Sequence, residues 1–175
     1  DYARINEATR GADVVIHAAA MKRIDLIEFN VFEAIKTNVL GTMNVVDSCV
    51  ENNVERAVFV STDKACSPMN AYGATKMLGE KAFIEGNNRE KSDTVFTIIR
   101  HGNMLGSFGS VVPIFIEKIK KGEEISLTDE RMTRFCVSPE KAVDVTLEAI
   151  KNGSGGETFV PKLKSFKVTD LIEVM

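Results

Sequence analysis

Tyr72 and Lys76 stand four positions apart in the segment AYGATK, a spacing that places both side chains on one face of a helix. A lysine ammonium beside a phenol lowers the pKa of the phenol, so the tyrosine can act as a base near neutral pH. The YxxxK pair alone is common by chance. Ser61 and Thr62 precede it at the end of an apolar segment, where a hydroxyl can share a substrate proton with the phenol. Together these residues predict proton abstraction from an alcohol.

An acid and a base, Asp63 and Lys64, lie between these hydroxyls and the tyrosine. One interpretation is a solvated ion pair on a surface loop, which is the commoner role of such a pair. The other is general acid and base chemistry, because the loop lies between a strand end and the helix of Tyr72. The two residues by themselves leave both interpretations open.

Two further segments contain groups that could bind phosphate. The three glycines of HGNMLGSFGS lie between a predicted strand and a predicted helix, but their spacing differs from the GxGxxG of dinucleotide-binding loops. Arg131 and Arg134 could bind phosphate oxygens bidentately. The alternative for these arginines is surface pairing with Asp129 and Glu130.

The hydrophobic pattern predicts the elements that position these groups. Short apolar segments rich in β-branched residues predict buried parallel strands, and apolar positions three or four apart predict helices. The predicted strands are 13–20, 56–62 and 94–100, and the predicted helices are 32–53, 71–87 with Asn70 as its cap, and 111–120. The first helix is expected to bury one face, formed by Phe32, Ile35, Val39, Met43, Val46 and Val50.

Beyond residue 120 the predicted elements become shorter. They are the segments EISLT, TRFCVS and ETFVP, a helix over 139–152 capped by Ser138, and a final helix capped by Thr169. The alternation of strands and helices predicts an α/β fold, a doubly wound, Rossmann-like parallel sheet with a smaller C-terminal substrate-binding lobe. We expect residues 1–110 to form the nucleotide-binding core and 111–175 mainly the lobe, which is not expected to fold independently.

Composition excludes several classes of protein. The 175 residues, 44% hydrophobic and 27% charged, are typical of one globular domain, and a net charge of −3 with interspersed signs argues against a nucleic-acid partner. No window approaches 18 consecutive apolar residues, and no basic start precedes an apolar core, so neither a membrane span nor a signal peptide is predicted. Three widely spaced cysteines predict reduced thiols and a cytoplasmic protein. His17 is expected to be structural, and two distant histidines form no metal-ligand cluster.

A series of longer motifs extends over essentially the whole chain. It comprises HAAAMK, TNVLGTMNV, STDKAC, PMNAYGATK, RHGNMLGSFGSVVP, DERMTRF and GGETFVPK. The series resembles the inverting UDP-N-acetylglucosamine 4,6-dehydratases, in the polysaccharide-biosynthesis branch of the extended short-chain dehydrogenase/reductase family. The resemblance implies an NADP or NAD cofactor, bound by Ala18, Ala19, Ala20, Asn38, Ser61, Tyr72 and Lys76. It also implies a homo-oligomer and a UDP-sugar substrate, bound by Lys22, Asn103, Val111, Arg131 and Arg134.

The implied reaction is the loss of water from the sugar. Tyr72, assisted by Thr62 and Lys76, takes the proton of the 4-hydroxyl while the cofactor accepts the hydride from C4. Lys64 then removes the C5 proton and Asp63 protonates the departing 6-hydroxyl, although these two roles could be exchanged. Two alternatives remain: a sugar-nucleotide 4-epimerase, which needs no acid and base for elimination, and a non-catalytic nucleotide-sugar-binding homologue.

The sequence departs from the family pattern at several points. His101 and Phe108 stand where Tyr and Arg are common, and MKRIDLIEFN replaces a basic, hydrophobic and proline-containing run, so the exact sugar stays open. No glycine-rich cofactor loop follows a first strand. We therefore expect the N-terminal part of the fold to be missing, with roughly 60 or more residues preceding Asp1.

Overall fold

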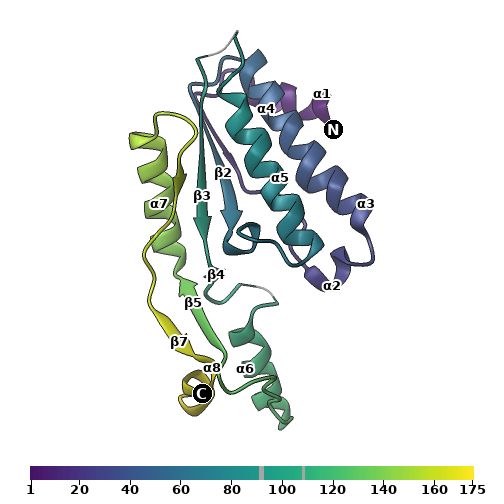
Figure 1. Cartoon of the computed structure of the whole chain (residues 1–175), viewed down its shortest axis with the longest axis vertical. Coiled ribbons are helices and arrows are strands. Elements are labelled where there is room, and N and C mark those ends of the chain that lie inside the picture. The colour runs from purple at the N-terminus through teal and green to yellow at the C-terminus, as the bar shows by residue number, and fades with distance from the viewer. Residues whose placement is uncertain (91–92, 108) are drawn as a thin grey trace. The chain divides into compact units, whose positions relative to one another are not determined.

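The computed structural model describes residues 1–90, 93–107 and 109–175, and Figure 1 shows the order of the elements. The described residues form two compact units. The first comprises Asp1–Arg100 and Asp144–Val160, and the second comprises His101–Val143 and Pro161–Met175. The expected division after residue 110 differs from this one, because the chain returns to the first unit at Asp144. The assignment of 111–175 mainly to substrate binding stays a prediction.

The first unit contains a four-stranded sheet in the order β1-β2-β3-β6. Its strands are β1 Val14–His17, β2 Arg56–Thr62, β3 Val95–His101 and β6 Thr158–Phe159. β1 is parallel to β2, and β3 is parallel to β6. The predicted α/β fold with parallel strands and flanking helices is confirmed.

Side chains of β2 alternate between two hydrophobic clusters, one on each face of the sheet. Ala57 and Phe59 belong to the cluster that includes Val45 and Phe83. Val58 belongs to the other cluster, with Ile99, Val145 and Ala149. Full burial of a large apolar side chain such as Phe59 contributes about 1.5–3 kcal/mol to stability. Figure 1 shows α7 on the opposite side of β2 and β3 from α4 and α5, as a doubly wound sheet requires.

The helices begin largely where capping residues predicted them. Asn70 accepts a hydrogen bond from the Gly73 amide, and Ser138 accepts one from the Lys141 amide, as expected. A helix that the sequence analysis missed begins after Asp1, whose carboxylate accepts from the Arg4 amide. The helices of the first 100 residues are α1 Tyr2–Thr9, α2 Ile24–Ile27, α3 Val31–Ala34, α4 Gly41–Glu51 and α5 Ala71–Gly86, and α7 is Pro139–Asn152.

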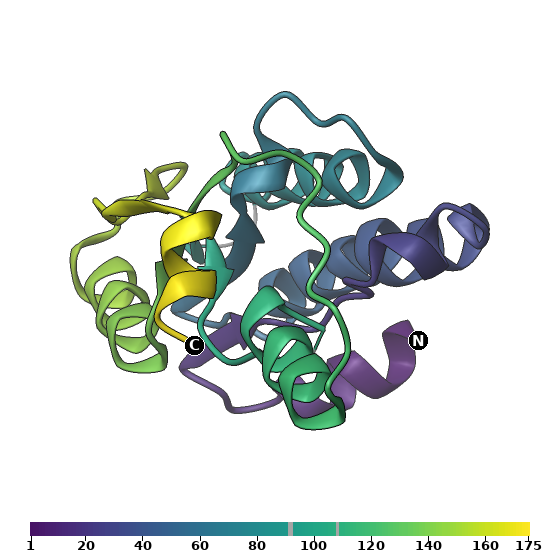
Figure 2. The same ribbon diagram turned by 90° about the horizontal axis from the view of Figure 1, so that it is seen from below.

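The helix predicted over 32–53 forms, but the expected buried face is only partly right, since Val46 is buried and Val39 and Val50 are half-buried. α3 and α4 are joined by η1, a π-helical segment over Ile35–Leu40, and the whole runs beside α5 (Figure 2). Phe32 is 82% exposed, and Ile35 and Met43 are also exposed. The residues turned inward are smaller or polar, namely Ala34, Asn38, Thr42, Val45, Val46, Ser48 and Cys49. The i→i+5 pattern of a π turn shifts the angular register that a regular 3.6-residue period assumes.

β1 is parallel as expected but is only partly buried. Val14 is 41% exposed and Ile16 is 51% exposed, whereas His17 is buried. β1 lies at the edge of the four-stranded sheet, so only β2 pairs with it among the described strands. The apolar composition of this segment therefore predicted the strand but not its exposure.

The second unit contains a three-stranded sheet in the order β4-β5-β7. β4 is Asn103–Met104, β5 is Thr133–Val137 and β7 is Ser165–Lys167, accompanied by α6 Val111–Lys121 and α8 Val168–Glu173. EISLT (124–128) forms no strand or helix, and Lys167, not Thr169, is the N-cap of α8. Gly102 packs so closely against Phe135 that a Cβ atom would lie 2.4 Å from its ring.

Candidate active site

The carboxyl ends of β1 and β2 lie next to each other. The two strands pair in parallel, with His17 opposite Phe59, so the segments that follow both strands emerge at the same edge of the sheet. One segment contains Ala18 to Lys22 and the other contains Asp63 and Lys64. In open α/β sheets this edge is where ligands bind.

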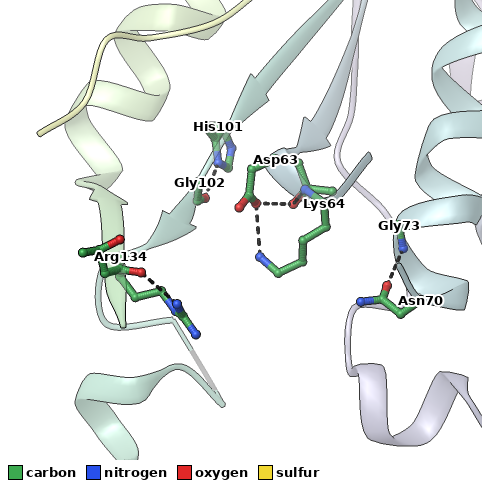
Figure 3. Close-up of polar contacts among 9 residues, drawn as sticks. Asp63, Lys64, Asn70, Gly73, His101, Gly102 and Arg134 are labelled. Carbon is green, nitrogen blue, oxygen red and sulfur yellow. Dashed lines mark hydrogen bonds and ion pairs between the residues drawn. The ribbon is translucent and has the colours of Figure 1, made fainter. Parts of the chain in front are cut away.

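Asp63 and Lys64 form a tight turn at the end of β2. They belong to η2, a 3-10 turn over Asp63–Ala65, and both side chains are about one-third exposed. Lys64 Nζ donates to Asp63 Oδ1 at 3.1 Å, and the Thr62 hydroxyl donates to the same oxygen at 2.9 Å, as Figure 3 shows for the ion pair. The acid and the base are therefore held together on a hydrogen-bonded turn.

The first turn of α5 packs directly on this turn. A Cβ atom on Gly73 would lie 2.2 Å from the carbonyl oxygen of Lys64, so only glycine fits there. Gly73 also donates its amide to the Asn70 cap at 2.8 Å (Figure 3). The importance of Gly73 was not predicted, although its place in the YGATK motif was a signal.

Tyr72 lies beside Thr62 and Asp63. Burial raises the pKa of the Tyr72 phenol, a hydrogen bond with the Thr62 side chain lowers it, and the Asp63 charge raises it again. The net direction is upward, which differs from the expectation that Lys76 holds this pKa down, because burial of the phenol is the largest effect. The Lys76 Nζ donates to the Val60 carbonyl at 2.8 Å.

Lys76 is a buried cation. Only 3% of the residue is exposed, and its Nζ lies 3.9 Å from the centroid of the Phe59 ring. Burial lowers the pKa of Lys76 to about 8, against a smaller opposing effect of Glu80. A cation in this position is stabilised by the Val60 carbonyl and by the face of the aromatic ring.

Asn38 joins three elements around the site. Its Oδ1 accepts from the Met21 amide at 2.8 Å, and its Nδ2 donates to the Met21 carbonyl at 3.0 Å and to Thr75 Oγ1 at 3.1 Å. Asn38 therefore ties η1 to the segment that follows β1 and to α5. Because its amide hydrogens are both engaged within the protein, Asn38 positions the site.

Ser61 belongs to a buried ionic network that the sequence analysis missed. Its hydroxyl donates to Glu80 Oε1 at 2.5 Å, and Arg100 Nε donates to the same oxygen at 3.1 Å. Arg100 and Glu80 also form a salt bridge, in which only 5% of the Glu80 side chain is exposed. Glu80 follows Lys76 by one helical turn, a spacing that could have suggested its inward direction.

The segment after β1 has small or exposed side chains. Ala18, Ala19 and Lys22 are exposed, and Ala20 is half-buried. His17 itself is buried, and burial, followed by the charge of Lys76, lowers its pKa to about 4. The prediction of a structural His17 therefore agrees with its burial, and the lowered pKa favours its uncharged form.

The remaining predicted site residues belong to the second unit. Asn103 lies in β4 opposite Cys136, and Val111 is the first residue of α6. The Arg131 side chain is 90% exposed and pairs with Asp129, the alternative that the sequence left open. Arg134 donates to the Thr133 carbonyl at 2.8 Å (Figure 3). Phe108, where the sequence departs from the family pattern, lies outside the described residues. Phosphate binding by the two arginines stays a prediction.

Two features are absent from the residues that the structure describes. No helix there is long and apolar enough to cross a membrane. No group of three or more His, Cys, Asp or Glu side chains in the same part of the chain could hold a metal ion.

Comparison with known proteins places the chain in a family. The family described as polysaccharide biosynthesis protein matches residues 1–175. The chain is 47% identical over 177 residues to a UDP-N-acetylglucosamine 4,6-dehydratase (inverting) of Campylobacter jejuni, covering 100% of this chain and 53% of that protein. It is 44% identical over 163 residues to a UDP-glucose 4-epimerase of Rickettsia rickettsii, covering 93% and 48%.

A solved structure shows the same fold. The X-ray structure of Pen from Bacillus thuringiensis superposes with a TM-score of 0.95 at 41% identity, covering 99% of this chain and 54% of that one. The chain thus spans about half the length of the curated relatives it matches. The match over its full length shows that the chain belongs to the polysaccharide biosynthesis protein family, within the extended short-chain dehydrogenase/reductase group that its motifs predicted.

Proposed function

We propose that the full-length protein is a nicotinamide-dependent lyase that dehydrates a UDP-sugar, UDP-N-acetylglucosamine, to a 4-keto-6-deoxy sugar nucleotide for surface polysaccharide or glycan biosynthesis. The observation that carries this proposal is the Asp63–Lys64 pair, held on one turn beside Tyr72 and Thr62. An acid and a base at this place are what elimination of water requires in addition to alcohol oxidation. The Campylobacter jejuni relative, at 47% identity, bears the name of this activity.

The chain's own residues divide the proton transfers between them. Tyr72 accepts the proton of the 4-hydroxyl, and its hydrogen bond with the Thr62 side chain lowers the pKa of the phenol. A ketone at C4 acidifies the C5 proton, which Lys64 removes while Asp63 protonates the departing 6-hydroxyl. In the observed ion pair Lys64 donates to Asp63 at 3.1 Å, so this proton must pass to Asp63 before Lys64 can act as the base and Asp63 as the acid. Without that transfer the two roles are exchanged.

The residues at the ends of β1 and β2 fit a nicotinamide dinucleotide, NADP or NAD. Ala18, Ala19 and Ala20 offer no bulky side chain above the sheet edge, and the Lys76 ammonium lies buried below the start of α5. A nicotinamide held there would supply reversible hydride transfer, taking a hydride from C4 of the sugar and giving it back at C6. Ser61 and Asn38 are engaged with Glu80 and Met21, so we assign them positioning roles toward the cofactor.

We assign the sugar nucleotide to Lys22, Asn103, Val111, Arg131 and Arg134. Arginine suits a diphosphate because its guanidinium binds two oxygens at once. Arg131 must leave Asp129 to do so, and its 90% exposure leaves the side chain room to move. Arg131→Ala and Arg134→Ala should weaken UDP binding in a calorimetric titration, and unchanged affinity in both variants would return these residues to surface pairing.

The sharpest test of the proposed function is Lys64→Ala in the full-length protein. Oxidation at C4 needs Tyr72 and Lys76, which are retained, whereas abstraction at C5 loses its base at a cost on the order of 10²–10⁴ in rate. The variant should accumulate the 4-keto sugar and should not incorporate solvent deuterium at C5, which mass spectrometry detects. Dehydration at the wild-type rate would identify Asp63–Lys64 as a surface ion pair.

A 4-epimerase is the second candidate, because the Rickettsia rickettsii relative at 44% identity bears that name. Identities of 47% and 44% do not separate the two activities. Product mass does, since dehydration removes one water and epimerisation leaves the mass unchanged. Retention of Tyr72 and Lys76 argues against the third reading, a non-catalytic binding protein.

We further propose a cytoplasmic homo-oligomer with no nucleic-acid partner. Phe29, between α2 and α3, is 90% exposed, and Phe32, in α3, is 82% exposed. Other exposed apolar residues such as Leu26 and Ile35 lie nearby in the sequence, and such patches mark protein interfaces. A second copy of the chain is the proposed occupant. Phe29→Ser combined with Phe32→Ser should lower the mass measured by light scattering, and an unchanged mass would exclude this face.

The free cysteines support the cytoplasmic assignment, which cell fractionation tests. The net charge of −3 supports the absence of a nucleic-acid partner, which a DNA-binding assay tests.

A further inference from the structure

A continuous series of hydrogen bonds connects the end of β1 to the first turn of α5. His17 Nε2 lies 2.9 Å from Thr42 Oγ1, and that hydroxyl donates to the Asn38 carbonyl at 2.7 Å. Asn38 Nδ2 donates to Thr75 Oγ1 at 3.1 Å, and Thr75 Oγ1 donates to the Tyr72 carbonyl at 2.9 Å. The series thus ends on the backbone of the proposed catalytic tyrosine.

The series has a defined direction. A hydroxyl carries one proton, and the Thr42 proton is used on the Asn38 carbonyl, so His17 Nε2 must be the donor in the first bond. Thr75 likewise accepts from Asn38 and donates to Tyr72. Each threonine hydroxyl therefore makes two bonds, and removal of one hydroxyl leaves two partner groups without that bond.

The members of the series are deeply buried. His17, Asn38, Thr42 and Thr75 are each at most 7% exposed. Unpaired polar groups are costly in such surroundings, so the bonds constrain the elements that supply them. The close approach of α5 to η1 has the same effect, since a Cβ atom on Gly79 would lie 3.3 Å from the Asn38 carbonyl oxygen.

Asn38 also fixes the segment that follows β1. It bonds both the amide and the carbonyl of Met21, directly after Ala18–Ala20. The same side chain therefore holds the proposed cofactor segment on one side and, through Thr75, the start of α5 on the other.

We propose that Thr42 and Thr75 are positioning residues for the oxidation step, which set Tyr72 and Lys76 relative to the segment that follows β1. This inference rests on the proposed function. Neither hydroxyl touches the substrate; each acts through Asn38 and the backbone of Tyr72. A displacement of about 1 Å of a reacting group can lower a rate on the order of 10²-fold, so loss of either hydroxyl should slow proton abstraction.

The test compares Thr42→Val and Thr75→Val with Thr42→Ser and Thr75→Ser in the full-length protein. Valine keeps the shape and removes the hydroxyl, whereas serine keeps the hydroxyl. Ser48→Ala in α4 is the matched control, because Ser48 is fully buried and its hydroxyl has no hydrogen-bond partner among the described residues.

The test uses two kinds of experiment, enzyme kinetics and hydrogen exchange. In single turnover with UDP-N-acetylglucosamine, the valine variants should reduce the nicotinamide about 10- to 100-fold more slowly with nearly unchanged KM, and the serine variants should recover to within a few fold. By hydrogen exchange without substrate, the amides of 18–23 and 71–77 should exchange faster in the valine variants. Ser48→Ala should match the wild type in both measurements.

The outcomes separate this inference from the proposed function. Folded valine variants with wild-type oxidation rates and unchanged exchange would overturn the positioning role. A wild type that oxidises no UDP-sugar would overturn the proposed function, and hydrogen exchange alone would then decide the positioning role. If Thr75→Val does not fold, Thr75→Ala takes its place, with the same expected and contrary results.

Discussion

At Tyr72, burial and hydrogen bonding act on the phenol in opposite directions. Burial raises the pKa of Tyr72, and a hydrogen bond with the Thr62 side chain lowers it. The Lys76 ammonium is bound by the Val60 carbonyl and the Phe59 ring, both of which belong to β2. The surroundings of the Tyr72 and Lys76 side chains therefore depend on β2 as much as on the YxxxK motif.

Removal of the Tyr72 hydroxyl should separate binding from chemistry. Tyr72→Phe deletes the proton acceptor but keeps the ring, so oxidation should fall by about 10²–10⁴-fold while UDP-sugar affinity changes by no more than a few fold. Stopped-flow absorbance of the nicotinamide measures the first quantity and calorimetry the second. Transient cofactor reduction at the wild-type rate would show that another group takes the proton.

At the scale of elements, the contact between η2 and α5 decides where the acid and the base lie. Gly73 stands against the Lys64 carbonyl with no space for a Cβ atom. Asn70 caps α5 at the same place by accepting from the Gly73 amide. The turn of Asp63 and Lys64 and the helix of Tyr72 and Lys76 are therefore packed as one assembly.

Gly73→Ala should force these two elements apart. A Cβ atom 2.2 Å from a backbone oxygen requires a shift of the turn, which should cost about 1–3 kcal/mol of stability and lower the dehydration rate about 10- to 100-fold. Chemical denaturation and product analysis measure the two effects.

Gly41→Ala is the control for this substitution. Its added Cβ atom would meet only the Lys36 carbonyl oxygen, at 3.5 Å, so it should be neutral or stabilise α4 by up to about 1 kcal/mol. Equal behaviour of the two alanine variants would disprove the steric argument.

At the scale of the whole molecule, the buried His17 links folding to pH. Burial lowers its pKa from 6.5 to about 4 in the folded chain. Between these values the unfolded chain binds more protons than the folded one, so stability falls as the pH falls through this window. The loss approaches roughly 3 kcal/mol by pH 4, from about 1.4 kcal/mol for each pKa unit.

His17→Gln should therefore flatten the dependence of unfolding free energy on pH between 6.5 and 4. Urea denaturation at a series of pH values measures this slope. His101→Gln, which removes the other of the two histidines, is the matched control. A His17→Gln slope equal to that of the wild type would show that other groups cause the acid sensitivity.

The sequence alone determined the order of strands and helices and the residues that end up at the carboxyl edge of the sheet. β2, α5 and the Asn70 cap follow from patterns within a few residues, because hydrogen bonding and side-chain direction in these elements depend on near neighbours. Ser61 to Lys64 lie close to Tyr72 for the same reason, since a short loop joins their strand to its helix.

The tertiary structure alone decided which faces are buried and which partners the polar groups find. Phe32 and Met43 point outward while Asn38 and Thr42 point inward, because the π turn at η1 rotates the helix and α5 packs against the other side. Lys76 pairs with Val60, and Glu80 with Arg100, across segments 16 and 20 residues apart. Such contacts form between segments distant along the chain, and no local pattern specifies the distance or orientation at which those segments meet.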